Sequence, residues 1–259
     1  MTTNEEQKTM KTSTLLFFSS FSNMKLSKCS KQLIFLIIAS FFSLNEASAR
    51  SEIILAKHDK MLPMGALRIE NRLAFMTGHV EVGLELYRLG ELQMAAKHLL
   101  HPISETHKEE RVGLEKLGLK KHVFEQVSES LRQNVAATEI SKLLDEAASN
   151  LNDLAAKVDG ESDRIIVFLL ETVLDEYSIA VSEERKILEL GEYQDAWGFI
   201  KVARSHASKV TIEDKDSLKS QLKDLHLLWK NGPLHSENVA SVKIVKSKID
   251  SILKIIDSR

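Results

Sequence analysis

Histidines and carboxylates gather in one stretch of the chain, between Gly78 and His107. Imidazole nitrogens and carboxylate oxygens bind first-row transition metals, and helical bundles hold such ligands on facing helices. The sequence does not specify a cofactor, but a transition metal such as iron or copper suits these donors. We therefore predict a metal site formed by four residues of this stretch. They are His79, His98, His101 and Glu105.

The spacing of these histidines depends on the helices that carry them. A hairpin turning at Gly90 would bring His79 opposite His98 or His101. His98 and His101 share a face only if the helix continues to His101, and Pro102 disfavours helical geometry at the residue before it. The Glu-x-x-His spacing of di-iron bundles is absent. The alternative interpretation is that His79, which lies on an apolar stripe, is a hydrogen-bonded core histidine.

A second polar cluster, Glu192-Tyr193-Gln194-Asp195-Ala196-Trp197, lies far along the chain. Its acids, Glu192 and Asp195, are interpreted as complementing the positive N-terminus of the helix they begin. Its aromatic side chains are expected to pack in the core. On the preceding apolar helix, a buried Glu171 or Asp175 would need a partner or a shifted pKa.

Catalytic motifs are missing from the sequence. It contains no G-x-S-x-G, H-E-x-x-H, P-loop or G-x-G-x-x-G pattern. The single cysteine, Cys29, lies near the N-terminus, so the rest of the chain has neither disulfides nor thiolate ligands. We expect a binding protein rather than an enzyme, and an exported enzyme ranks third among the alternatives.

The N-terminal segment has the three parts of a secretory signal peptide. Residues 24–49 combine a lysine-containing start, an apolar core (Leu33–Leu44) and the small residues Ala47-Ser48-Ala49. The apolar core is shorter than the roughly 20 residues that a membrane-spanning helix needs. We therefore expect residues 1–23 to be a disordered leader or a mis-assigned start, 24–49 to be cleaved after Ala49, and 50–259 to form a single all-α domain. The product would be exported, to the periplasm or the extracellular space.

Composition limits the partners. The formal net charge is −2, and a chain without a basic stripe is a poor nucleic-acid ligand because phosphate neutralisation supplies most of that affinity. No later segment reaches membrane-spanning length, so we expect no stable membrane insertion after cleavage. The expected partner is a small ligand, a metal or another protein. The sequence does not specify an oligomeric state.

Helical periodicity runs through the rest of the chain, with few glycines and three prolines. We predict an all-α antiparallel bundle of about eight to nine helices with tetratricopeptide-like hairpins. Gly90 and Gly191 are each expected to end a long helix, and Thr138 to cap one. The expected helices are 66–89, 92–100, one opening at Pro102, 109–117, 122–135, 138–158, 163–190, 192–209, 212–230 and 238–257.

The two glycines belong to a short internal echo, since residues 89–95 (LGELQMA) match residues 190–196 (LGEYQDA). The echo resembles the core of a tetratricopeptide helix pair. The segments FMTGHVEVGLELYRLGELQMAAKHLLHPISE and LELGEYQDAWGFIKVA resemble a family of uncharacterised exported helical proteins of bacteria. The second segment also resembles the helical extracytoplasmic parts attached to bacterial high-affinity iron permeases. The sequence Gly78-His79-Val80-Glu81 does not reproduce the G-x-H-x-x-E motif of imelysin-type iron-uptake proteins, so the resemblance assigns no metal ligands.

Together these features predict an exported, soluble helical binding protein that holds a transition metal or a metal-containing ligand through its His/Glu cluster. The alternative is a structural or adaptor protein without catalytic activity, which binds a partner protein through the surfaces of its helical hairpins.

Overall fold

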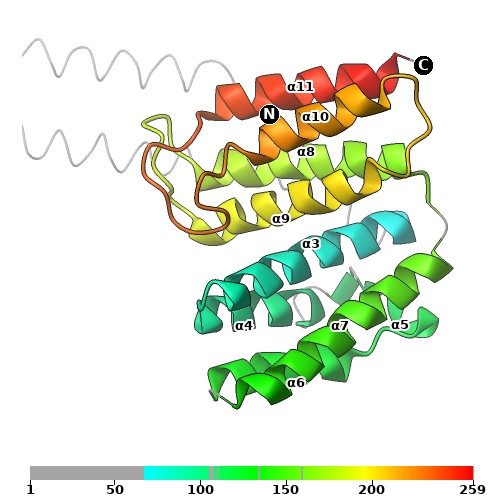
Figure 1. The fold of residues 1–259 in the computed structure, drawn as a ribbon, viewed down its shortest axis with the longest axis vertical. Coiled ribbons are helices and arrows are strands. Elements are labelled where there is room, and N and C mark those ends of the chain that lie inside the picture. Colours follow the sequence, from blue (N-terminus) through cyan, green and yellow to red (C-terminus); the bar gives the residue numbers. More distant parts are fainter. Residues whose placement is uncertain (1–66, 105–107, 110, 134, 159, 259) are drawn as a thin grey trace, which may run out of the picture. The chain divides into compact units, whose positions relative to one another are not determined.

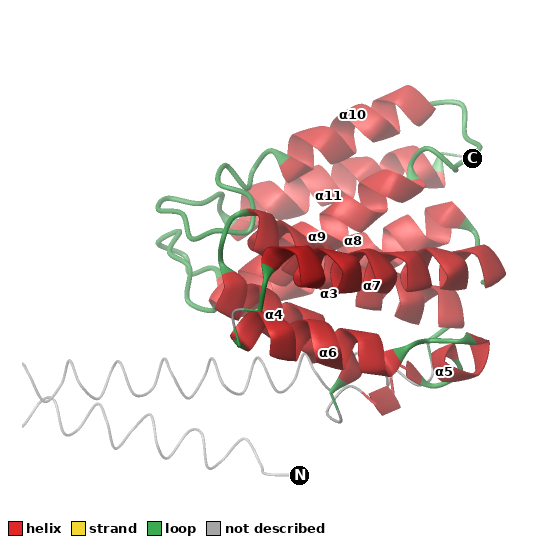
Figure 2. Ribbon diagram, turned by 60° about the horizontal axis from the view of Figure 1, so that its bottom comes forward, coloured by secondary structure: helices red, strands yellow, loops and turns green. Residues whose placement is uncertain are grey.

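The computed structural model describes residues 67–104, 108–109, 111–133, 135–158 and 160–258. The regular elements in these ranges are helical, as Figure 2 shows, apart from an isolated antiparallel bridge between Val181 and Ile187. The all-α prediction is therefore confirmed. The expected leader (1–23) and signal peptide (24–49) lie outside the described residues. Within the described ranges, no helix is at once long enough and apolar enough to cross a membrane.

Helix pairs stack on one another within a compact unit, Met61–Arg259 (Figure 1). The order of the stack is α10–α11, α8–α9, α3–α4 and α6–α7. Helix α3 lies at its centre and contacts α9 on one side and α4 and α7 on the other. The elements are α3 (Ile69–Arg88), α4 (Leu92–Leu100), η2 (His101–Ile103), α5 (Leu114–Leu117), α6 (Lys121–Arg132), α7 (Ala137–Lys157), α8 (Ser162–Ala180), α9 (Leu190–His206), α10 (Lys215–His226) and α11 (Val242–Asp257).

The hairpin between α3 and α4 turns at Gly90, as predicted. Gly90 has φ +84°, the left-handed conformation that ends many helices. Its N–H donates to Tyr87 O (3.0 Å), and the N–H of Glu91 donates to Leu86 O (2.9 Å), which completes a Schellman motif. The chain therefore reverses within a few residues, and the return helix packs against α3.

Helix α8 ends ten residues earlier than its apolar pattern predicts, at Ala180. The chain then turns through Arg185, which has φ +63° and donates to the carbonyl oxygens of Val239 (2.7 Å) and Asn238 (2.9 Å). The prediction that Gly191 ends a helix is wrong, because this glycine lies in the first turn of α9. The two glycines of the internal echo thus have opposite positions, one after a helix and one inside the next.

Two smaller predictions are also wrong. The helix expected over 109–117 is reduced to α5, which begins only after Gly113, where φ is +91°. Thr138 lies inside the first turn of α7 and does not cap it, since the N-cap position is occupied by Ala136.

Aromatic side chains join α8, α9 and the segment before α11. Tyr177 packs edge to face against Trp229 and Tyr193 packs against it at a tilt, with ring centroids 4.9 Å and 5.6 Å away. The buried Trp229 Nε1–H donates to Tyr193 O (3.0 Å), and the Tyr177 hydroxyl donates to Ala240 O (2.8 Å). These bonds hold the irregular segment after α10 against the bundle.

Candidate metal centre

His79 lies at the middle of α3, facing α9, and only 2% of the residue is exposed. Phe75 and Phe199 pack against the imidazole at centroid distances of 4.7 Å and 5.3 Å, both edge to face. These rings exclude water from two sides of the imidazole and fix its plane. The side chain is therefore a core residue with a defined orientation.

Asp195, on α9, is the hydrogen-bond partner of His79. Its Oδ1 lies 2.7 Å from His79 Nδ1, and both side chains are almost fully buried. Burial alone would raise the pKa of Asp195, but the imidazoles of His79 and His98 outweigh it and hold the pKa far below its usual value. An ionised carboxylate only accepts hydrogen bonds, so His79 Nδ1 is the donor. In the neutral imidazole, Nε2 then carries a lone pair.

His98, on α4, contacts the same carboxylate from the other side. Its Nδ1 lies 3.1 Å from Asp195 Oδ1, and its Nε2 lies 2.8 Å from Gln194 Oε1. Burial lowers the pKa of His98, but the Asp195 carboxylate and the Gln194 oxygen more than compensate, and the pKa is raised. The contact with His98 helps to hold the Asp195 carboxylate in place.

His101 completes the group from the short helix η2. Its backbone is helical (φ −48°, ψ −56°), so the prediction that Pro102 would disfavour helical geometry there is wrong. The His79 and His101 rings lie 4.5 Å apart, centroid to centroid. One ligand atom from each of His79, His101 and Asp195 lies within 4.8 Å of the other two. The helices thus bring two imidazoles and one carboxylate to a single point.

A pair of glycines allows α3 and α9 to come this close. A Cβ on Gly198 would lie 2.5 Å from Val82 Cγ2 and would overlap the backbone of Gly78 on the facing helix. Gly78 directly precedes His79, and Gly198 lies one turn after Asp195. The short His79–Asp195 distance therefore depends on the absence of side chains at this crossing.

Three features of the site suit a metal ion. His79 Nε2 is buried and has no hydrogen-bond partner among the described residues, which leaves a lone pair uncompensated. A carboxylate on the other ring nitrogen is the arrangement that fixes the tautomer of metal-binding histidines. A surface cavity of about 310 Å³, lined by Met94, His101 and Asp195 among others, gives access from solvent.

A pair of carboxylates lies beside this group. Glu176, on α8, is hydrogen-bonded to Glu192 at the start of α9. Burial and the carboxylate of Glu192, with added repulsion from Asp195 and Asp175, raise the pKa of Glu176 well above its usual value. Such a pair tends to share one proton, because ionising both adjacent carboxylates costs electrostatic repulsion between two like charges.

The predicted site residues have different outcomes. The structure brings His79, His98 and His101 together, while Glu105 lies outside the described residues. Sequence reasoning missed Asp195, which was interpreted as an N-terminal helix charge and is instead the centre of the network. The signal that pointed to it was the second polar cluster, which contains the only carboxylate that His79 contacts among the described residues.

Residues 159–258 match the family model of an iron permease-associated 4-helix bundle domain. This range contains α8, α9, α10 and α11, so the resemblance to helical parts of iron-uptake proteins is confirmed for these four helices. Asp195 lies within the matched range, whereas His79, His98 and His101 lie before it. Comparison with curated proteins and with solved structures gave no match. The likeness to tetratricopeptide pairs and to uncharacterised exported proteins stays a prediction.

Proposed function

We propose that this protein binds a divalent transition-metal ion through the ring nitrogens of His79 and His101, with the Asp195 carboxylate as the outer partner of His79, and that it serves metal uptake. The observation that carries the proposal is the convergence of these three side chains, each with a ligand atom within 4.8 Å of the others. The family match favours Fe²⁺ as the ion. The signal-like segment at residues 24–49 supports export, and we place this binding step outside the cytoplasm.

In this proposal the residues around the ligands have separate tasks. His79 and His101 donate ring nitrogens, and Asp195 both holds the His79 tautomer and adds negative charge. His98 Nδ1 lies 3.1 Å from Asp195, and the hydrogen bond between His98 Nε2 and Gln194 Oε1 (2.8 Å) fixes the His98 ring beside this carboxylate. Phe75 and Phe199 keep the His79 ring from rotating. The network is built before a metal arrives, so binding requires little reorganisation.

The test is metal binding by the purified full chain. Anaerobic titration with Fe²⁺ should show one ion per chain and raise the melting temperature. At a free metal concentration of 100 Kd the gain is about 2.7 kcal/mol, or roughly 5–10 °C for a chain of this size. The variant for comparison is His101→Ala, because His101 is only half-buried and its loss should spare the fold. The matched control is His122→Ala, at an exposed position on α6.

We expect His101→Ala to weaken binding more than the about 10–100-fold that the loss of an outer partner costs. His122→Ala should bind like the unmodified protein. Equal binding by the two variants, or no metal-dependent rise in melting temperature, would overturn the proposal. The histidine–aspartate network would then be a structural element of the core.

A further inference from the structure

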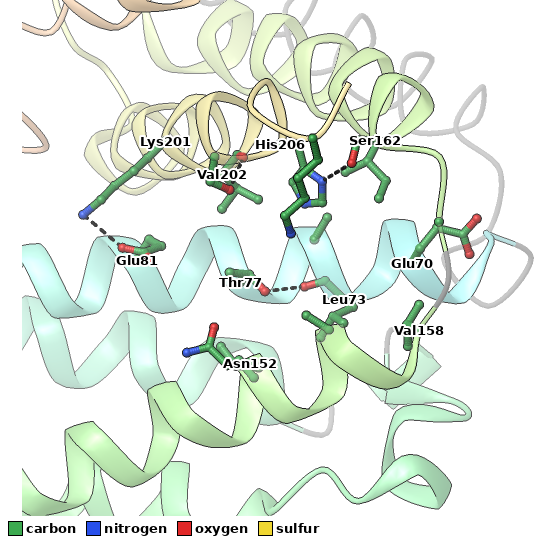
Figure 3. A pocket seen from close by; sticks show the side chains of 17 residues that line it. Glu70, Leu73, Thr77, Glu81, Asn152, Val158, Ser162, Lys201, Val202 and His206 are labelled. Carbon is green, nitrogen blue, oxygen red and sulfur yellow. Dashed lines mark hydrogen bonds and ion pairs between the residues drawn. The ribbon is translucent and has the colours of Figure 1, made fainter. Parts of the chain in front are cut away.

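A second cavity lies away from the metal centre, between α3, α7, the start of α8 and the end of α9 (Figure 3). Its volume is about 450 Å³, within the range of small-molecule sites. It shares no lining residue with the cavity beside His101. The two cavities are therefore separate.

The lining of this cavity combines aliphatic and polar side chains. The aliphatic ones include Leu73, Leu151 and Ile165. Polar groups come from α3 and α7 and also from α8 and α9, where Ser162 Oγ and His206 Nδ1 lie 3.2 Å apart and Lys209 follows three residues later. Figure 3 shows His206 and Ser162 meeting above α3. An occupant with an apolar body and one polar group would match this mixed lining.

One cationic side chain in the described lining has no carboxylate partner. Glu81 is paired with Lys201 (2.9 Å), and Glu70 is paired with Arg68. Lys209 has no carboxylate partner among the described residues. Burial, with a smaller contribution from Lys209, lowers the pKa of His206 to about 4, so this imidazole is neutral at pH 7.

We propose that this cavity binds a small organic monocarboxylate, with its carboxylate at Lys209 and its apolar body against Leu73, Leu151 and Ile165. The Ser162 hydroxyl and the His206 ring are the neighbouring hydrogen-bonding groups. One unpaired lysine matches a single negative charge. The described lining offers no arginine, the residue best suited to holding a phosphate through paired hydrogen bonds. The site is independent of the proposed metal centre.

The experiment uses the full chain and three probes: phenylacetate, its neutral analogue phenylacetamide, and inorganic phosphate. Binding is followed by NMR through the backbone amide signals of Ser162 and His206. Phenylacetate should shift both signals and bind about 10-fold more tightly than phenylacetamide, because one charge-assisted hydrogen bond is lost with the amide. Phosphate should neither shift the signals at matched concentration nor displace phenylacetate.

Variants locate the site. Lys209→Ala should weaken phenylacetate about 10-fold and leave phenylacetamide unchanged, while the control Lys254→Ala, at an exposed position on α11, should change neither. Ala155→Phe, which fills the cavity from an exposed lining position, should abolish binding of both organic probes. Binding should persist in His101→Ala. Equal affinity for acid and amide, preference for phosphate, or full binding by Ala155→Phe would each overturn the proposal.

Discussion

The crossing of α3 and α9 at two glycines gives a quantitative test of how the proposed metal site is assembled. We consider the substitution Gly198→Ala. The added Cβ would lie 2.5 Å from Val82 Cγ2, about 1 Å closer than ordinary contact between carbon atoms. It would also overlap the backbone of Gly78, which cannot rotate away as the tip of a side chain can. The two helices must therefore separate or slide.

The expected cost follows from two opposing effects. Overpacking of this kind costs about 1–3 kcal/mol, while replacing glycine with alanine inside a helix returns about 0.5–1 kcal/mol. The net loss should be about 0–2.5 kcal/mol, or at most roughly 10 °C in melting temperature for a chain of this length. Gly191→Ala is the matched control on the same helix, because nothing lies within 4 Å of its added Cβ. This control should be neutral or slightly stabilising.

The measurement is urea denaturation of both variants, followed by Fe²⁺ titration of each. Because Asp195 lies one turn before Gly198, separation of the helices should lengthen the 2.7 Å bond to His79. Metal binding should then weaken about 10-fold or more in Gly198→Ala, as for the loss of an outer partner, and stay unchanged in Gly191→Ala. If Gly198→Ala is as stable as the control, the close crossing is not a feature of the folded protein and our account of the site is refuted.

Three further substitutions test other parts of the structure. Glu176→Gln should stabilise the protein at pH 8 more than at pH 5. The raised pKa of Glu176 makes the folded state hold a proton that the unfolded chain releases, so this residue costs more stability as pH rises; equal effects at both pH values would contradict this. Trp229→Phe should cost about 0.5–1.5 kcal/mol in urea denaturation, because it removes the buried hydrogen bond from the indole N–H to Tyr193 O; a neutral change would show that water replaces the indole. Burial lowers the pKa of His226 to about 4, so its neutral form favours folding above its ordinary pKa of 6.5, and that contribution is lost as pH falls toward 4. His226→Gln should therefore flatten the decline in stability between pH 6.5 and 4, and an unchanged slope would exclude this histidine as a cause.

Local signals sufficed for part of the fold. The α3–α4 hairpin could be predicted because Gly90 provides a left-handed turn between two periodic segments. The end of α8 could not, because its apolar spacing continues past Ala180. The chain leaves the helix where Arg185 binds the carbonyl oxygens of Val239 and Asn238, more than 50 residues away in sequence. Tertiary bonds of this kind leave no trace in the periodicity of either segment.

Only the histidines of the α3–α4 hairpin, and not the carboxylate from α9, could be predicted as parts of the candidate site. Histidine density identified the α3–α4 hairpin, and the helical turn at Gly90 explains why His79 and His98 lie near each other. The partner carboxylate, Asp195, lies 116 residues from His79, and no spacing rule connects them. Two facing glycines, at positions 78 and 198, make the contact possible. The sequence alone does not show whether such a glycine breaks a helix or allows two helices to approach closely.

The long separation between His79 and Asp195 bears on the order of events during folding. Closing a loop of 116 residues costs about 4 kcal/mol of chain entropy, which local turns such as the α3–α4 hairpin largely avoid. The imidazoles and the carboxylate therefore meet only after α3 and α9 have docked through their apolar surfaces. In zinc fingers the ion drives folding, whereas here α3 and α9 have to dock before the bond between His79 and Asp195 exists. In the proposed function, an ion would thus enter a site in which the His79 tautomer is already fixed.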